Sequence, residues 1–225
     1  MAHHPSGPPR TLVLAEQLTL RTSRGMVFGP VDAELTAGSV VLLVGPSGSG
    51  RSALLLALTG RMAGLEGTLV VDHQHLDRSR TVRSIASVAR ITGLVEIEEQ
   101  LTVPECITER CLMDGVPTAQ GADRMALLAG RLGLHLTDDL VVDLPALDRT
   151  LLAVGLACIR PPELVVLDDL DLGLRREEQL HVLRRLERLA EDGVTVVASC
   201  LEDPSAGRYP IIELPDPAAH TAGAR

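Results

Sequence analysis

The stretch that decides the fold is Gly45-Pro46-Ser47-Gly48-Ser49-Gly50-Arg51-Ser52. It matches the phosphate-binding loop pattern G-x-x-x-x-G-K-[ST], except that an arginine takes the place of the lysine. The apolar run at residues 40–44 precedes the loop, and a helix-forming run at residues 52–58 follows it. A strand, a glycine-rich turn and a helix bring backbone N–H groups together at the positive end of the helix dipole. The sequence therefore predicts that residues 45–52 bind a nucleoside triphosphate, with Mg²⁺ held by the hydroxyl of Ser52.

Arg51 keeps the positive charge of the loop lysine but carries it on a side chain of a different shape. All 21 basic residues of the chain are arginines, so the substitution belongs to a chain-wide absence of lysine and does not by itself indicate a lost function. A planar guanidinium on a longer arm does not replace a compact ammonium between the β- and γ-phosphates. We therefore expect nucleotide affinity to be kept in part and hydrolysis to suffer more.

The length and charge of the chain narrow the classes of protein. A chain of 225 residues suits one domain, or one domain with a small inserted subdomain. The net charge of −9 argues against a broad nucleic-acid-binding surface. The sequence contains no apolar run of about 18 residues, so no membrane-spanning helix is expected. The chain has four cysteines, which are Cys106, Cys111, Cys158 and Cys200. None of them forms a C-x-x-C pair, so reduced thiols are expected rather than a zinc site.

Apolar runs alternate with helical periodicity, which predicts an α/β fold with a mostly parallel sheet. The expected strands are residues 11–20, 31–35, 40–44, 67–72, 85–89, 164–167, 194–199 and 209–214. The expected helices are residues 52–58, 119–132, 148–159 and 175–190, with a further helix capped by Thr102 and Glu105 in a capping box. One domain is expected over residues 11–214, with a helical subdomain inserted at about 102–159. Residues 1–10 are expected to be disordered, and residues 215–225 to form a loose tail.

Two neighbouring carboxylates, Asp168 and Asp169, end the buried strand predicted at 164–167. Because parallel strands deliver their carboxyl ends to one edge of the sheet, these acids are expected beside the phosphate loop. In a phosphate-loop protein Asp168 would hold Mg²⁺ together with Ser52. Asp169 would then be the catalytic residue that orients or activates the attacking water. The alternative is that the two acids simply cap a strand.

The order and spacing of these motifs resemble the ATP-binding cassette (ABC) ATPases, the nucleotide-binding subunits of ABC transporters. In that family an L-S-G-G-Q signature opens a helix 24 residues before the Walker B aspartate, and Leu144 stands 24 residues before Asp168. The family's L-T-V-x-E segment is similar to Leu101-Thr102-Val103-Pro104-Glu105, and its Asn-Pro before the Walker B strand is similar to Pro161-Pro162. The resemblance covers residues 11–214. It implies a P-loop NTPase fold of ABC type, with an N-terminal antiparallel β part and an inserted helical subdomain.

Several positions depart from the family's pattern, and they belong to parts that sense or attack the γ-phosphate. The S-G-G-Q of the family's signature aligns with Pro145, Ala146, Leu147 and Asp148. The family's catalytic Glu aligns with Asp169, its switch His with Cys200, its Q-loop Gln with Arg90 and its D-loop Asp with Arg175. Asp169 is one methylene shorter than Glu, and a misplacement of about 1 Å can cost roughly 100-fold in rate. Phe28 is the candidate for an adenine-stacking aromatic, and we expect it in the core instead.

The resemblance implies that the chain binds ATP and Mg²⁺ and hydrolyses ATP slowly to drive a separate transmembrane permease. It also implies a homodimer, or a heterodimer with another ATP-binding subunit, in the cytoplasm at the inner face of the cell membrane. No nucleic-acid partner is expected.

Two alternatives stay open. One is a non-hydrolysing relative in which ATP binding is structural or regulatory. The other is a different P-loop enzyme, such as a small-molecule kinase. In a kinase Arg184, Arg185 and Arg188 would hold a second substrate, although a solvated helix face is the favoured interpretation of these arginines.

Overall fold

The computed structural model describes residues 10–75 and 79–216, so the predictions for residues 1–9 and 217–225 lie outside the described part. The elements follow one another as β1 (Thr11–Thr22), β2 (Gly25–Thr36), β3 (Val40–Val44), α1 (Arg51–Leu58), β4 (Leu65–Val71), β5 (Gln74–His75), α2 (Ser79–Ile85), β6 (Ala86–Arg90), α3 (Val103–Asp114), α4 (Thr118–Leu132), the 3₁₀ helix η2 (Val141–Asp143), α5 (Ala146–Ala157), β7 (Leu164–Leu167), α6 (Arg176–Glu191), β8 (Thr195–Cys200) and β9 (Ile211–Glu213).

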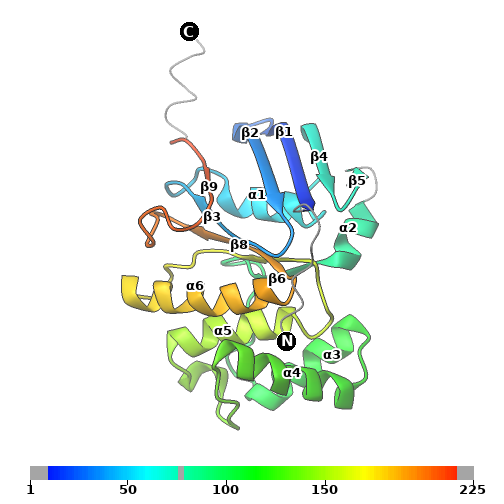
Figure 1. Ribbon diagram of the computed structural model, residues 1–225, viewed down its shortest axis with the longest axis vertical. Helices are drawn as coiled ribbons and strands as arrows, with labels where there is room; N and C mark the ends of the chain where they lie inside the picture. The colour runs from blue at the N-terminus through cyan, green and yellow to red at the C-terminus, as the bar shows by residue number, and fades with distance from the viewer. Residues whose placement is uncertain (1–9, 76–78, 217–225) are drawn as a thin grey trace.

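Two sheets form the framework of the molecule (Figure 1). One is antiparallel with the order β2-β1-β4-β5, and the other has the order β6-β7-β8-β3-β9 with parallel pairs. The strands β3 and β7 read as unbroken apolar runs, which suits parallel strands covered on both faces. The predicted α/β fold, with a mostly parallel sheet and an N-terminal antiparallel part, is confirmed.

The parallel sheet separates two apolar cores. Leu42 and Val165 belong to one core, whereas Leu43 and Val166, the next residues along the same strands, belong to the other. This division follows from the strand period of two, which places successive side chains on opposite faces. Helices α3 to α6 cover the first core, and α1 with the antiparallel sheet covers the second (Figure 1).

The helical block consists of α3, α4 and α5. Thr102 caps α3 as predicted, because its hydroxyl accepts from the N–H of Glu105 while the Glu105 carboxylate accepts from the N–H of Thr102 at 2.8 Å. The ends of α4 and α5 lie within two residues of their predicted positions. The treatment of residues 102–159 as a separate subdomain stays a prediction.

The sequence pattern missed α2 and indicated only the strand that follows it. Helix α2 buries a single side chain, Val82, so its apolar periodicity is too weak to mark a helix. Within the ranges 10–75 and 79–216, no helix has both the length and the apolar character that crossing a membrane requires.

Candidate functional site

The loop between β3 and α1 adopts, at two positions, a backbone conformation that favours glycine. The φ angles of Gly48 and Gly50 are 79° and 93°, in the left-handed region. At Gly50 a Cβ atom would also clash with the carbonyl oxygen of Val27 in β2. Gly50, the second glycine of the pattern, is therefore required by the loop conformation and by its packing against β2, and Gly48, at a position that the pattern leaves open, is required by the loop conformation.

The N-terminus of α1 presents a group of backbone donors. In the described ranges, the N–H groups of Gly48, Gly50, Arg51 and Ser52 have no acceptor within the protein. They lie at the positive end of the helix dipole, which favours a negatively charged group. This arrangement fits the phosphates of a nucleotide.

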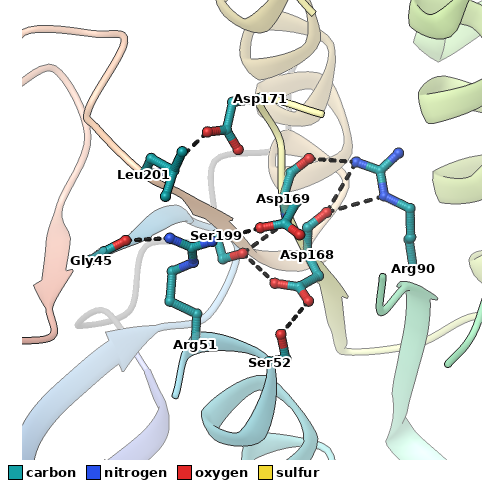
Figure 2. A network of polar contacts seen from close by, with 9 residues as sticks. All are labelled: Gly45, Arg51, Ser52, Arg90, Asp168, Asp169, Asp171, Ser199 and Leu201. Carbon is teal, nitrogen blue, oxygen red and sulfur yellow. Dashed lines mark hydrogen bonds and ion pairs between the residues drawn. The ribbon is translucent and has the colours of Figure 1, made fainter. Parts of the chain in front are cut away.

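Ser52 and Asp168 meet although 116 residues separate them in the sequence (Figure 2). The Ser52 hydroxyl donates to one carboxylate oxygen of Asp168 at 2.5 Å, and the Ser199 hydroxyl donates to the other at 2.5 Å. Asp168 is fully buried. A hydroxyl and a carboxylate are the hard oxygen ligands that hold Mg²⁺ beside phosphate oxygens in nucleotide sites. The pair therefore fits the predicted magnesium site.

The remaining ligands of such an ion would have to come from the nucleotide and water. The described residues contain no group of three or more His, Cys, Asp or Glu side chains placed to hold a metal ion. This agrees with the usual binding of Mg²⁺ by one or two protein oxygens together with substrate phosphates. The roles of Ser52 and Asp168 as magnesium ligands stay predictions.

The guanidinium of Arg51 is engaged within the protein. Figure 2 shows that it donates to the carbonyl oxygen of Gly45 and forms an ion pair with Asp169, with 2.7 Å between Nη2 and Oδ1. The Arg51 side chain is only 10% exposed, and its buried Nε has no hydrogen-bond partner among the residues that the structure describes. The residue in the lysine position and the predicted catalytic residue are thus paired with each other, a contact that the sequence did not indicate.

Ser199 fixes the turn that carries the two acids, and the sequence analysis missed it. Asp169 has a φ of 45°, which is uncommon for a residue other than glycine, and its N–H donates to the Ser199 hydroxyl at 2.8 Å. The N–H of Leu170 donates to the Ser199 carbonyl oxygen at 2.7 Å. Because the same hydroxyl donates to Asp168, Ser199 orders both acids. A signal existed, since a serine within the apolar run of β8 needs a hydrogen-bond partner when buried.

Arg90 ends β6 and reaches the same turn (Figure 2). Its guanidinium donates to the carbonyl oxygen of Asp168 at 3.0 and 3.1 Å, and to that of Asp169 at 2.7 Å. It also donates to the hydroxyl of Thr150 on α5 at 3.3 Å. Burial lowers the pKa of Arg90, and the negative charges of Asp169 and Asp168 oppose that shift. Arg90 therefore holds the backbone of the acidic turn and links it to the helical block.

Comparison with known sequences decides the family. Residues 28–170, more than half of the chain, match the profile of the family described as ABC transporter. This chain belongs to the ABC transporter family. ABC transporter G family member 18 of Arabidopsis thaliana is 28% identical over 187 residues, which cover 78% of this chain and 26% of that protein. This ABC chain thus spans between about a sixth and a quarter of the length of the plant relatives it matches.

A microbial relative covers a similar part of this ABC chain. The energy-coupling factor transporter ATP-binding protein EcfA of Methanothermobacter thermautotrophicus is 25% identical over 175 residues. Those residues cover 75% of this chain and 56% of that protein.

Solved ABC cassettes share the fold. The ADP conformation of MJ1267, an ATP-binding cassette of an ABC transporter, has a TM-score of 0.75 at 18% identity and covers 91% of this chain and 87% of that chain. The dimeric bacterial cassette MJ0796 has a TM-score of 0.74 at 19% identity and covers 91% and 94%. At these identities the likeness concerns the fold alone, and it confirms the predicted ABC ATPase type.

At three positions where this ABC protein departs from the family pattern, the described residues show no side-chain hydrogen bond or ion pair with the loop. Cys200 is fully buried at the end of β8, where burial raises the pKa of its thiol to about 12. Its carbonyl oxygen accepts from the N–H of Gly45 at 3.3 Å. Across the described residues, no hydrogen bond or ion pair joins the loop to Asp148, in the first turn of α5, or to Arg175, the N-cap of α6.

Both aromatic rings of this ABC chain are buried. The chain has one Phe, one Tyr and no Trp. Phe28 in β2 is 1% exposed and Tyr209 is 8% exposed, so the expectation that Phe28 is a core residue is confirmed. Neither ring offers an exposed face on which an adenine could stack.

Proposed function

We propose that this ABC protein is the ATP-binding subunit of a transporter, and that it binds MgATP and hydrolyses it slowly to drive a separate membrane permease. The observation that carries the proposal is the pairing of Ser52 with Asp168, whose oxygen atoms lie 2.5 Å apart. This pair adjoins the free N–H groups at the start of α1. The proposed phosphate donors and the proposed magnesium ligands therefore lie together at one edge of the parallel sheet.

The loop and the two oxygen ligands have separate tasks in this proposal. The N–H groups of Gly48, Gly50, Arg51 and Ser52 would hold phosphate oxygens. Ser52 and Asp168 would hold Mg²⁺, which neutralises phosphate charge when it is bound. Because the rings of Phe28 and Tyr209 are both buried, neither is available to the base, and the affinity would come mainly from the phosphates.

Asp169 is the residue proposed to orient the attacking water. Its side chain is 24% exposed, so water reaches the carboxylate, but Arg51 lies 2.7 Å away. The ion pair occupies the carboxylate, which must leave Arg51 before it can orient a water molecule. Slow hydrolysis follows from this pairing and from a side chain one methylene shorter than glutamate.

The proposed partners are a transmembrane permease and a second ATP-binding subunit. The cassette MJ0796 has been solved as a dimer, and cbiO1 of Clostridium perfringens, with a TM-score of 0.72 to this chain, is part of the ABC transporter complex cbiONQ. By analogy we place this chain in a homodimer or heterodimer on the inner face of the cell membrane. Arg51 weakens the loop half of each site, and Pro145 with Asp148 weakens the signature half. No choice of partner would then give a complete site, because each site would keep at least one weakened half.

A specific observation also supports a non-hydrolysing relative as the second candidate. The ion pair between Arg51 and Asp169 leaves neither side chain free, and the buried Cys200 takes the place of the switch histidine. In that case ATP binding would be a structural or regulatory signal. No observation favours a small-molecule kinase.

Steady-state phosphate release from MgATP separates these candidates. The Asp169→Asn variant keeps the size of the side chain, and we expect its rate to fall by about 100-fold, the lower end of the usual contribution of a general base. Asp171→Asn is the matched control, because the Asp171 carboxylate accepts from the N–H of Leu201 at 3.3 Å and does not contact the loop. Equal rates of phosphate release in the wild type and in Asp169→Asn would show that Asp169 takes no part in catalysis. Tight MgATP binding without any turnover would establish the non-hydrolysing relative.

A further inference from the structure

A cavity of about 290 Å³ lies between the end of β6 and helix α5, next to the acidic turn. Part of its lining is apolar, because Ala89, Val141 and Ala153 are buried members of the core that the helical block covers. The volume is close to the lower end of the range for small-molecule sites. The cavity therefore suits a small ligand with a short apolar part.

Charged side chains of both signs line the same cavity. Arg90 and Arg149 supply two guanidiniums, and Glu96 and Glu99 supply two carboxylates. Arg149 belongs to α5, whereas both glutamates belong to the segment that follows β6. Among the residues that the structure describes, no ion pair joins these guanidiniums to these carboxylates. The four charged groups are therefore available to a ligand.

The two guanidiniums are satisfied by carbonyl oxygens rather than by carboxylates. Arg149 donates to the carbonyl oxygen of Val142 at 3.3 Å, and Arg90 donates to the carbonyl oxygens of the acidic turn (Figure 2). Burial lowers the pKa of Arg90, and the carboxylates of the acidic turn and of Glu96 oppose that shift, so Glu96 lies near Arg90. A carbonyl oxygen leaves the charge of a guanidinium uncompensated, so a ligand carboxylate would form the stronger, charge-assisted hydrogen bonds.

The mixture of charges selects the kind of ligand. A simple anion would bring its charge toward Glu96 and Glu99, and a simple cation would bring its charge toward Arg90 and Arg149. Like charges brought together in this way disfavour both. A molecule that carries an ammonium and a carboxylate together satisfies both pairs, and a short apolar side chain can pack on the apolar lining.

We propose that the cavity binds a small amino acid with an apolar side chain, whose carboxylate pairs with Arg90 and Arg149 and whose ammonium pairs with Glu96 and Glu99. Arg90 also holds the backbone of Asp169 through its carbonyl oxygen at 2.7 Å, so the ligand would contact the residue that orders the acidic turn. The bound amino acid would therefore regulate the nucleotide site. That regulation rests on the proposed function, whereas the binding of the amino acid does not.

Isothermal titration calorimetry with L-norvaline, in the absence of nucleotide, tests the site. Norvaline carries both charges and a short unbranched side chain, and we expect saturable binding at about 1 mM or below. Pentanoate is the same molecule without the ammonium, and butylamine is the same molecule without the carboxylate. Each should bind about tenfold or more weakly, because each lacks one set of charge-assisted hydrogen bonds.

Two variants remove one charge each from the cavity with little change in size. Arg149→Gln and Glu96→Gln should each weaken norvaline binding by about tenfold or more. We expect their thermal midpoints to stay unchanged, because the amide oxygen introduced by Glu96→Gln can still accept from the N–H of Gly93 and Arg149 donates to one carbonyl oxygen. Arg184→Gln and Glu98→Gln are the matched controls, at exposed residues outside the cavity lining, and should leave binding unchanged.

Each part of the proposal has an outcome that would overturn it. The site is wrong if norvaline shows no saturable binding, if pentanoate or butylamine binds as tightly, or if the control variants lose as much affinity as Arg149→Gln and Glu96→Gln. Saturating norvaline should change the dissociation constant of MgATP by about twofold or more, because coupling between two sites is reciprocal. An unchanged constant would overturn the regulation, whereas a failure of MgATP to bind would count against the proposed function and not against the amino-acid site.

Discussion

The guanidinium of Arg51 lies 2.7 Å from the carboxylate of Asp169, so the residue that replaces the loop lysine is paired with the proposed catalytic residue. Both side chains are largely removed from solvent, at 10% and 24% exposure. The pair sits between the phosphate loop and the turn after β7 (Figure 2). A γ-phosphate would have to compete with Asp169 for the arginine, which couples nucleotide binding to the release of the carboxylate.

Restoring the lysine should therefore raise turnover. In Arg51→Lys the shorter arm and compact ammonium cannot bind Gly45 and Asp169 as the guanidinium does, and they suit the space between β- and γ-phosphates. We expect phosphate release to rise by about tenfold, which corresponds to about 1.4 kcal/mol in the barrier. Arg51→Gln, which removes the charge, is the control and should weaken MgATP binding. A slower Arg51→Lys enzyme would contradict the inhibitory role of the ion pair.

Ser199 should contribute to stability as well as to the site. Ser199→Ala leaves a buried oxygen of Asp168 without its donor and the partly buried N–H of Asp169 without its acceptor. We expect the free energy of unfolding to fall by about 2 kcal/mol or more, the usual cost of unsatisfied buried groups. Urea denaturation measures this, with Ser84→Ala as the control, because Ser84 is an exposed serine of α2. Equal stability of the two variants would show that the turn does not depend on Ser199.

The buried thiols predict how stability changes with pH. Burial raises the pKa of Cys106 to about 11, and burial raises the pKa values of Cys158 and Cys200 to about 12. Since these folded-state values exceed the unfolded ones, the thiols stabilise the fold fully below about pH 8.5 and lose that contribution as the pH rises toward the folded values. Between about pH 9 and 10 each thiol should approach a slope of about 1.4 kcal/mol per pH unit.

Denaturation curves across this pH range check the prediction. Cys200→Ser removes one titrating thiol and should make the loss of stability with rising pH smaller than in the wild type. If stability falls equally with rising pH in the wild type and in Cys200→Ser, the pKa of Cys200 is the same in the folded and unfolded states, which would contradict the prediction.

The fold was largely readable from the sequence because its signals are local. The apolar run of β3, the glycine-rich turn and the helix that follows belong to one continuous stretch, and the capping box of Thr102 with Glu105 spans four residues. Helix α2 escaped prediction because it buries only Val82. Its position is set by packing rather than by its own periodicity.

The contacts of the candidate site could be predicted only in part from the sequence. The meeting of Ser52 with Asp168 was expected, because parallel strands end at one edge of the sheet. The contacts of Arg51 and Arg90 were not expected, since long side chains select among partners that are distant in the sequence. Sequence spacing places the residues at the site, but the conformations of the two arginines decide what each charge contacts.

Isothermal titration calorimetry with MgATP tests the central claim most directly. We predict saturable binding at millimolar or lower MgATP, weakened by Ser52→Ala when Mg²⁺ is present and little changed by that variant when Mg²⁺ is chelated. This pattern is expected because Ser52 would act on the nucleotide through the ion. The absence of heat and of saturation at millimolar MgATP, with a folded sample, would contradict the assignment of residues 45–52 and Asp168 as a MgATP site.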